Sequence, residues 1–157
     1  MKDVEHILRQ YNETMSGEAW YGDHVWKILQ GIDARCAAAP VLPQVHTIWQ
    51  LVMHMAFWEE VAIRRFRGPV PSDEEEAGNF RDTPAPDEDA WQETLQRFRA
   101  SNDAFRAALS RLDPATLDQN TPARQKSFRW EAVGLIQHHI YHIGQIAILK
   151  KAFQARG

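Results

Sequence analysis

The sequence predicts an all-α fold in which residues 1–157 form one four-helix-bundle domain. Four long stretches place apolar residues at helical spacing, and breaks that carry proline or glycine separate these stretches. Runs of β-branched residues that alternate with polar ones, as in a strand, are scarce. Helices that each carry one apolar stripe must bury those stripes against one another, and a bundle of four satisfies all of them.

The first long pattern covers residues 16–32, and a short extra helix over residues 3–13 precedes it. Ser16 can cap the long helix, and Glu18 suits the positive end of its dipole. The apolar residues that follow at roughly helical spacing are Trp20, Val25, Ile28, Leu29 and Ile32. We therefore expect residues 16–32, and not the short N-terminal helix, to supply the first helix of the bundle.

The second pattern covers residues 46–68 and has clear signals at both ends. Thr47 and Gln50 have the spacing of a capping box, and a Gly-Pro pair ends the segment. One face, stepping by three, four and three residues, consists of Leu51, His54, Trp58 and Val61. His54 therefore belongs to the apolar face of this helix and not to its polar face.

Residues 69–86 contain several prolines and a run of acidic residues, which is typical of a long exposed loop. This loop is either a solvated connector, the more common case, or a lid over a site. The third helical pattern follows over residues 87–112, with Asp87 as its N-cap. Its apolar residues have the spacing of a bundle helix with one solvent-exposed face: Trp91, Leu95, Phe98, Phe105, Leu109 and Leu112. The fourth pattern runs from near Trp130 to about Phe153.

Composition and charge exclude several classes of function. The 18 Lys and Arg residues against 21 Asp and Glu residues give a net charge of −3, which does not favour nucleic acid or an anionic membrane as partner. The sequence has no apolar run long enough to span a membrane, and its N-terminus is too charged for a secretory signal. Cys36 is the single cysteine, so an internal disulfide is impossible. We expect a cytoplasmic protein that acts on a small molecule.

Three histidines lie within five positions of the fourth pattern. His138 and His142 are separated by about 40° around a helix, whereas His139 points about 100° away from His138. Two imidazoles at this i,i+4 spacing can hold one metal ion, and His54 is the candidate third ligand. Three histidine ligands leave a coordination position open, as catalytic zinc sites do. The alternative is that each imidazole is a hydrogen-bonded core residue, and spacing alone does not separate the two interpretations.

Two further residues bear on this candidate site. Gln145 lies three residues after His142 on the same face, where it could bond a metal-bound water or the second ring nitrogen of a ligand. It could equally be a satisfied buried amide. His24 lies between apolar residues of the first pattern, so it could face the core as a further ligand or as a substrate contact.

No other catalytic set competes in the sequence. It contains no nucleophile elbow of the G-x-S-x-G type, and Cys36 has no evident base near it. Glu59 and Glu60 precede Arg64 and Arg65 at helical spacing, so salt bridges explain them.

Three segments resemble the DinB-like family, which is also grouped as YfiT-like metal-dependent hydrolases. The segment "HTIWQLVMHMAFWE" is similar to the second helix of that family, "HxxxHxxQI" to its fourth, and "EAWYGDHVWKILQGI" to the first helix of one subgroup. The resemblance covers nearly the whole chain. It implies an up-down-down-up bundle, often a homodimer, with a divalent ion, zinc or nickel in most relatives. Carried over position by position, the three ligands are His54, His138 and His142.

The resemblance also suggests an activity, because some relatives are S-transferases that use bacillithiol or mycothiol and one branch isomerises maleylpyruvate. We expect a metal-dependent enzyme that transfers a small thiol cofactor to an electrophile or hydrolyses a small substrate. Gln145, Tyr141 and Trp58 are the residues expected to shape the cofactor pocket. Thiol transfer is favoured over hydrolysis because Glu131 is the one acid evident on the ligand face, about two turns from the histidines.

Two alternatives remain open at this point. The first is a stress-related bundle protein that binds a metal or a small ligand without turnover. The second concerns the register, since His139 and His142 form an i,i+3 pair that could chelate in place of His138. The family spacing to Gln145 favours His138.

Overall fold

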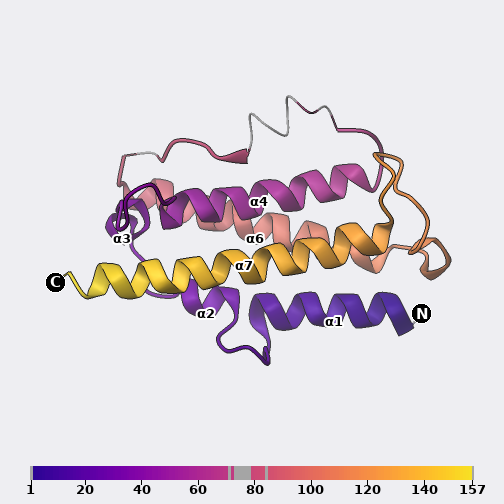
Figure 1. The fold of residues 1–157 in the computed structure, drawn as a ribbon, viewed down its shortest axis with the longest axis horizontal. Helices are drawn as coiled ribbons and strands as arrows, with labels where there is room; N and C mark the ends of the chain where they lie inside the picture. The colour runs from indigo at the N-terminus through magenta and orange to yellow at the C-terminus, as the bar shows by residue number, and fades with distance from the viewer. Residues whose placement is uncertain (1, 71, 73–78, 84, 157) are drawn as a thin grey trace.

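The structure is a computed structural model that describes residues 2–70, 72, 79–83 and 85–156. Within these residues, four long helices form the bundle: α1 (Lys2–Ser16), α4 (Ile48–Arg65), α6 (Glu88–Ser110) and α7 (Phe128–Gln154) (Figure 1). The short helices α2 (Val25–Leu29) and α3 (Ala34–Ala38) lie between α1 and α4, and the 3-10 turn η1 (Pro114–Thr116) follows α6. The described part of the chain contains no strand, which confirms the all-α class.

The direction of the four long helices is up, down, down and up, as expected. In Figure 1, α1 runs away from the N-terminus toward the left, α4 and α6 both run back to the right, and α7 returns to the left. α4 packs against α6 and α7, and α1 packs against the same two helices. Because α4 and α6 run in the same direction, the chain between them must return along the length of the bundle.

The first bundle helix is α1, so the expectation of a short extra helix followed by a long one over residues 16–32 is wrong. The inner face of α1 steps by three, four and four residues and is made of Val4, Ile7, Tyr11 and Met15, all buried. Ser16 ends this helix instead of capping the next one. A loop follows in which Gly22 adopts a φ of 130°, a conformation that L side chains rarely adopt. Trp20, expected on the apolar stripe, is fully exposed in this loop.

The remaining helices begin where their capping residues lie. Thr47 and Gln50 form the expected capping box, with reciprocal bonds of 3.2 and 3.0 Å between side chain and backbone. Asp87 caps α6 as expected. Ser127 accepts a hydrogen bond from the Trp130 backbone, so α7 begins two residues earlier than the apolar pattern indicated. These caps set where α4 and α7 begin, and both helices carry histidines of the candidate site.

Aromatic side chains fill the centre of the bundle. The largest fully buried ones are Trp49, Trp91, Tyr11, Phe98 and Phe105. The indole of Trp49 donates to Thr94 over 2.9 Å, and the indole of Trp91 donates to the Ile32 carbonyl over 2.8 Å. Buried indole nitrogens of this kind need a partner, and both have one.

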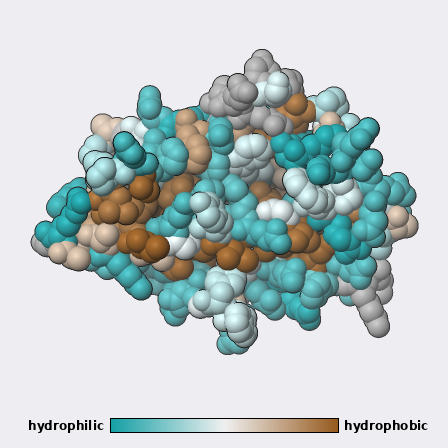
Figure 2. All heavy atoms as spheres, viewed as in Figure 1, coloured by the Kyte–Doolittle hydropathy of each residue, from teal (hydrophilic) through white to brown (hydrophobic). Residues whose placement is uncertain are grey.

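The outer face in Figure 2 is mainly hydrophilic, with hydrophobic side chains gathered in a band across its middle, where α7 lies nearest the viewer. Large apolar or aromatic residues that remain exposed are Trp20, Tyr21, Leu42, Val45, Trp130, Tyr141 and Ile148. Among the described residues, no helix is long and apolar enough to cross a membrane.

Candidate metal centre

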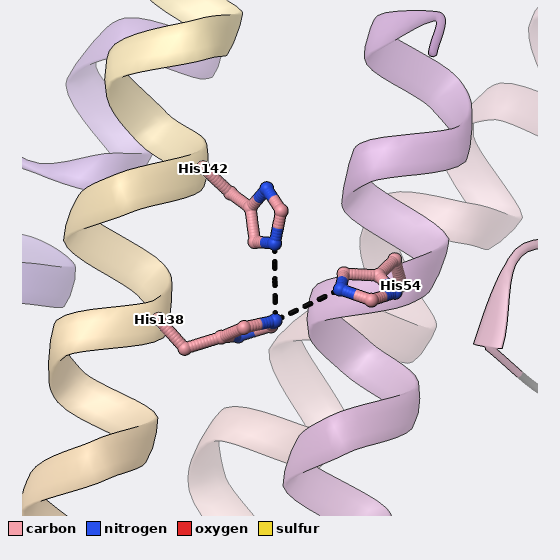
Figure 3. A group of neighbouring side chains, drawn as sticks. All are labelled: His54, His138 and His142. Carbon is pink, nitrogen blue, oxygen red and sulfur yellow. Dashed lines mark hydrogen bonds between the residues drawn. The ribbon is translucent and has the colours of Figure 1, made fainter. Parts of the chain in front are cut away.

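Three imidazoles from two helices converge on one point. His54 comes from the middle of α4, and His138 and His142 come from successive turns of α7 (Figure 3). The Nε2 atom of His138 lies 2.8 Å from Nε2 of His54 and 3.0 Å from Nε2 of His142. One ligand atom from each ring lies within 4.8 Å of the other two. The structure therefore brings together the three residues that helical spacing selected.

The outward ring nitrogens of two histidines have fixed partners. Nδ1 of His54 lies 2.7 Å from the backbone carbonyl of Asn79, and Nδ1 of His142 lies 2.7 Å from the side-chain carbonyl of Gln145. A carbonyl oxygen only accepts, so each Nδ1 carries the proton and donates it. The Nε2 atom of each neutral ring then presents a lone pair toward His138, which is the tautomer that a metal ligand requires.

His138 cannot satisfy this arrangement by itself. A proton on its Nε2 atom can be donated to one of the two facing lone pairs, but not to both. A proton on its Nδ1 atom is no better, because that buried nitrogen has no hydrogen-bond partner among the described residues. An unsatisfied buried polar group costs about 1–3 kcal/mol. A cation bonded to all three Nε2 atoms would remove the conflict, and imidazole nitrogens suit borderline ions such as zinc and nickel.

All three rings are in the neutral form that binds metal. Burial lowers the pKa of His54 to about 4 and that of His138 to about 2, and it also lowers the pKa of His142. Unfavourable interaction between the neighbouring imidazolium charges adds to the effect on each ring. The hydrogen bonds that His54 and His142 donate to the carbonyl oxygens of Asn79 and Gln145 raise the pKa, but by less than burial lowers it. Protons therefore do not compete strongly for these nitrogens at neutral pH.

The segment after α4 covers the outer side of His54. The ring of Phe80 stacks on His54 at a centroid distance of 4.1 Å and on His46 at 3.6 Å, nearly parallel to both. The Asn79 side chain accepts a hydrogen bond from the indole of Trp58 over 3.1 Å. Residues 71, 73–78 and 84 of the expected loop lie outside the described residues. The described residues 79–83 lie against α4, so this part is a cover and not a free connector.

A cavity of about 350 Å³ opens next to His138, between α4 and α7. Its lining consists of Trp58, Ala62, Arg65, Arg124, Trp130, Glu131, Gly134, Leu135 and His138. Trp58 therefore faces the cavity. Tyr141 lies outside the lining and is largely exposed, with its ring 5.1 Å from that of His142.

Comparison with known proteins identifies the family of this chain. A sequence profile of the DinB superfamily matches residues 4–146. The chain belongs to the DinB superfamily. The match includes all three histidines of the cluster and Gln145. No curated protein and no solved structure matches the chain. On this DinB fold, the three-histidine cluster could bind a divalent metal ion.

His139 of this DinB-superfamily chain faces the core and not the cluster. Its Nε2 atom lies 2.8 Å from the carboxylate of Glu59, and both residues are fully buried. The same carboxylate accepts hydrogen bonds from Tyr11 over 2.5 Å, from Asn102 over 2.7 Å, and from Ser101. The sequence suggested a salt bridge between Glu59 and an arginine of the same helix. It could not reveal the buried role of Glu59, because the partners come from α1, α6 and α7.

The structure also gives a role to each of the two other residues considered in the sequence, His24 and Gln145. His24 is the N-cap of α2, where its Nδ1 atom accepts a hydrogen bond from the Lys27 backbone over 3.1 Å. It is not part of the cluster. Gln145 acts on the second nitrogen of His142, which is one of the two roles weighed for it. The sequence missed Asn79 and Arg124, because their importance comes only from contacts with residues distant in the chain.

Proposed function

We propose that this protein is a metal-dependent enzyme that transfers a small thiol cofactor to an electrophilic small molecule. His54, His138 and His142 would hold a divalent ion, with zinc or nickel as the candidates. The observation that carries the proposal is the convergence of three neutral imidazoles whose Nε2 atoms meet beside a cavity of about 350 Å³. A binding cavity that includes one of the candidate ligands gives a small molecule access to the ion.

Each part of the site has a role in this proposal. A divalent ion with three histidine ligands keeps a position open and lowers the pKa of a thiol or water bound there, which supplies a nucleophile at neutral pH. The Asn79 carbonyl and Gln145 orient two of the rings through their Nδ1 atoms. The side chains of Phe80 and Trp58 limit the access of water to His54.

Among the described residues, the cavity offers no free carboxylate as a general base, which supports thiol transfer over hydrolysis. Glu131 is the one carboxylate among the described residues that line the cavity. Its Oε2 atom accepts from Arg65 over 3.2 Å, and its Oε1 atom accepts from Arg124. Hydrolysis needs a group that positions water and takes up its proton, and neither oxygen of Glu131 is available for that task. A thiol that ionises on binding an ion needs no such partner.

The test combines metal binding with turnover. Protein loaded with zinc or nickel is incubated with bacillithiol, mycothiol or glutathione and with an alkyl chloride, and products are identified by mass spectrometry. We expect the thiolate sulfur to form a carbon–sulfur bond with loss of chloride, faster than with metal-free protein or with His142→Ala. Stoichiometric metal without turnover for any thiol would instead favour a non-catalytic binding protein. Protein that binds no metal would contradict both interpretations.

A further inference from the structure

The cavity beside His138 combines apolar walls with an excess of positive charge. Among the described residues of its lining, the charged groups are two guanidinium groups, those of Arg65 and Arg124, and one carboxylate, that of Glu131. Cationic groups therefore outnumber anionic ones in the described part of the lining. A positive charge in a cavity that excludes much of the solvent attracts an anion.

Arg124 lies at the solvent-exposed mouth of the cavity, whereas Arg65 is buried. Arg65 and Glu131 form a buried ion pair, with side chains only 8% and 4% exposed. Glu131 thus has a buried cationic partner without Arg124. The Arg124 side chain is 37% exposed and donates to Glu131 through Nε. In the described part of the chain, its two terminal nitrogens make no hydrogen bond, so they remain as donors for a ligand.

A second cation lies beside the first. The Arg124 guanidinium lies 4.9 Å from the ring centroid of Trp130, and the Lys126 ammonium lies 4.9 Å from the same centroid. The indole of Trp130 is half exposed and holds both cations near the mouth. An anion that binds the terminal nitrogens of Arg124 would therefore also lie in the field of Lys126.

The helix sets the distance between this positive group and the histidine cluster. Glu131, which holds Arg124, precedes His138 by seven residues of α7. At a rise of 1.5 Å per residue this separation is about 10 Å along the helix axis. The wall between the two ends is apolar and includes Trp58, Ala62 and Leu135.

We propose that the cavity selects an elongated anionic molecule whose reacting head lies at the three histidines and whose carboxylate or phosphate binds Arg124. Its middle would be apolar and would lie against Trp58 and Leu135. This inference rests on the proposed function and deepens it, since it names the class of small molecule that the site takes. Arg124 is then a residue that determines specificity, and not a catalytic residue.

Matched thiols of different length and charge test the inference by binding alone. An extended chain spans about 1.2 Å per bond, so a separation of about 10 Å corresponds to about eight bonds. The probes are therefore 8-mercaptooctanoate, 8-mercaptooctanol and the short pair 3-mercaptopropionate and 3-mercaptopropanol, measured by calorimetry on zinc-loaded protein. We expect the long acid to bind about five- to tenfold more tightly than the long alcohol, and the short pair to bind equally. Replacing the long acid by 8-mercaptooctyl phosphate shows which anion is preferred.

Two variants locate the effect. Arg124→Gln should remove the advantage of the long acid while leaving the affinity for the long alcohol unchanged, which also shows that the variant is folded. Arg111→Gln removes the same charge from an exposed position at the end of α6 and should keep the advantage. Equal affinity of the long acid and alcohol for the unsubstituted protein, or an advantage that survives in Arg124→Gln, would overturn the inference alone. Thiols that bind no better with zinc than without it would overturn the proposed function, and the inference with it.

Discussion

At the scale of single residues, the site depends on which way neighbouring side chains point. His138 and His139 are adjacent in sequence, but one faces His54 and the other faces the buried Glu59. The difference follows from the helical rotation of about 100° per residue. Two residues of the same type therefore have separate tasks, one at the candidate metal centre and one in the core.

This division predicts opposite effects of two substitutions. His138→Ala removes the central ligand, so the purified protein should lose its bound divalent ion. His139→Gln should keep the ion but lower the free energy of unfolding by about 1–3 kcal/mol, because the buried carboxylate of Glu59 loses a well-placed donor. Elemental analysis and thermal melts measure the two effects. Loss of metal in His139→Gln but not in His138→Ala would show that His139, and not His138, is the ligand.

The buried imidazoles also predict how stability depends on pH. The histidines of the unfolded chain have a pKa near 6.5, whereas burial lowers that of His54 to about 4 and lowers that of His142. As pH falls, the unfolded chain takes up protons first, so each ring reduces the free energy of unfolding by up to about 1.4 kcal/mol per pH unit. This stability is complete above about pH 6.5 and is lost as pH falls toward the lowered values.

A bound metal ion should increase the pH dependence of the protein's stability. Protons compete with the ion for the same nitrogens, so the rise in melting temperature caused by zinc should shrink toward acid. Melts between about pH 4.5 and 8, with and without chelator, measure both the protein's own dependence and the part due to metal. A zinc effect of constant size across this range would mean that histidines do not hold the ion.

At the scale of elements, the chain after α4 returns over the site that α4 helps to form. Phe80 stacks on His54, and the Asn79 carbonyl fixes the tautomer of the same ring. Further hydrogen bonds attach the segment to the start of α4, one between Thr83 and Thr47 over 2.9 Å and one from Gln50 to the Arg81 carbonyl over 3.2 Å. The connection therefore contributes directly to the geometry of the candidate centre.

Removing the stacked ring should make bound metal easier to extract. An aromatic contact of this kind contributes about 0.5–1.5 kcal/mol, so Phe80→Ala should raise the rate of zinc loss to a chelator by about two- to tenfold. Stopped-flow measurements with a colorimetric chelator follow the release. Phe153→Ala removes a partly buried phenylalanine at the far end of α7 and should leave the rate unchanged. Equal rates in all three proteins would mean that the segment does not restrict the site.

At the scale of the whole molecule, the bundle keeps apolar groups at its surface. Trp49 and Trp91 are core residues, so the count of tryptophans alone does not support association. The exposed residues Tyr141 and Ile148 are better support, because they are two turns apart on the same face of α7. This helix lies nearest the viewer in Figure 1, and Figure 2 shows hydrophobic side chains across the same region.

We therefore predict a homodimer that uses the outer face of α7. Light scattering at micromolar concentration should give about twice the chain mass of 18.1 kDa. Ile148→Asp places a charge in the interface, which is costly to bury, and should shift the mass toward that of one chain. Trp20→Ser alters an even more exposed residue, in the loop before α2, and should keep the dimer. A single-chain mass for the unsubstituted protein would contradict the prediction.

Helical periodicity and capping residues predict much of the fold from the sequence alone. The pattern from Thr47 onward predicts α4 with its capping box, and Asp87 predicts the start of α6. The first helix was assigned wrongly because an apolar stripe around Trp20 has nearly helical spacing. The stripe from Val4 to Met15 is the cleaner of the two, with a spacing of three, four and four residues, and it is the one that the structure buries.

The sequence by itself determined the all-α class and the choice of His54, His138 and His142, because helical rotation places such residues on faces that must be buried. Tertiary structure alone decided that the two faces meet, with 2.8 Å between the Nε2 atoms of His54 and His138. It also decided which residues orient the rings and which charges line the cavity beside them. Asn79 and Arg124 reach the site from connecting segments, and no periodicity relates such segments to a helix face. Local spacing fixes direction within one helix, whereas contact between elements depends on how the whole chain packs.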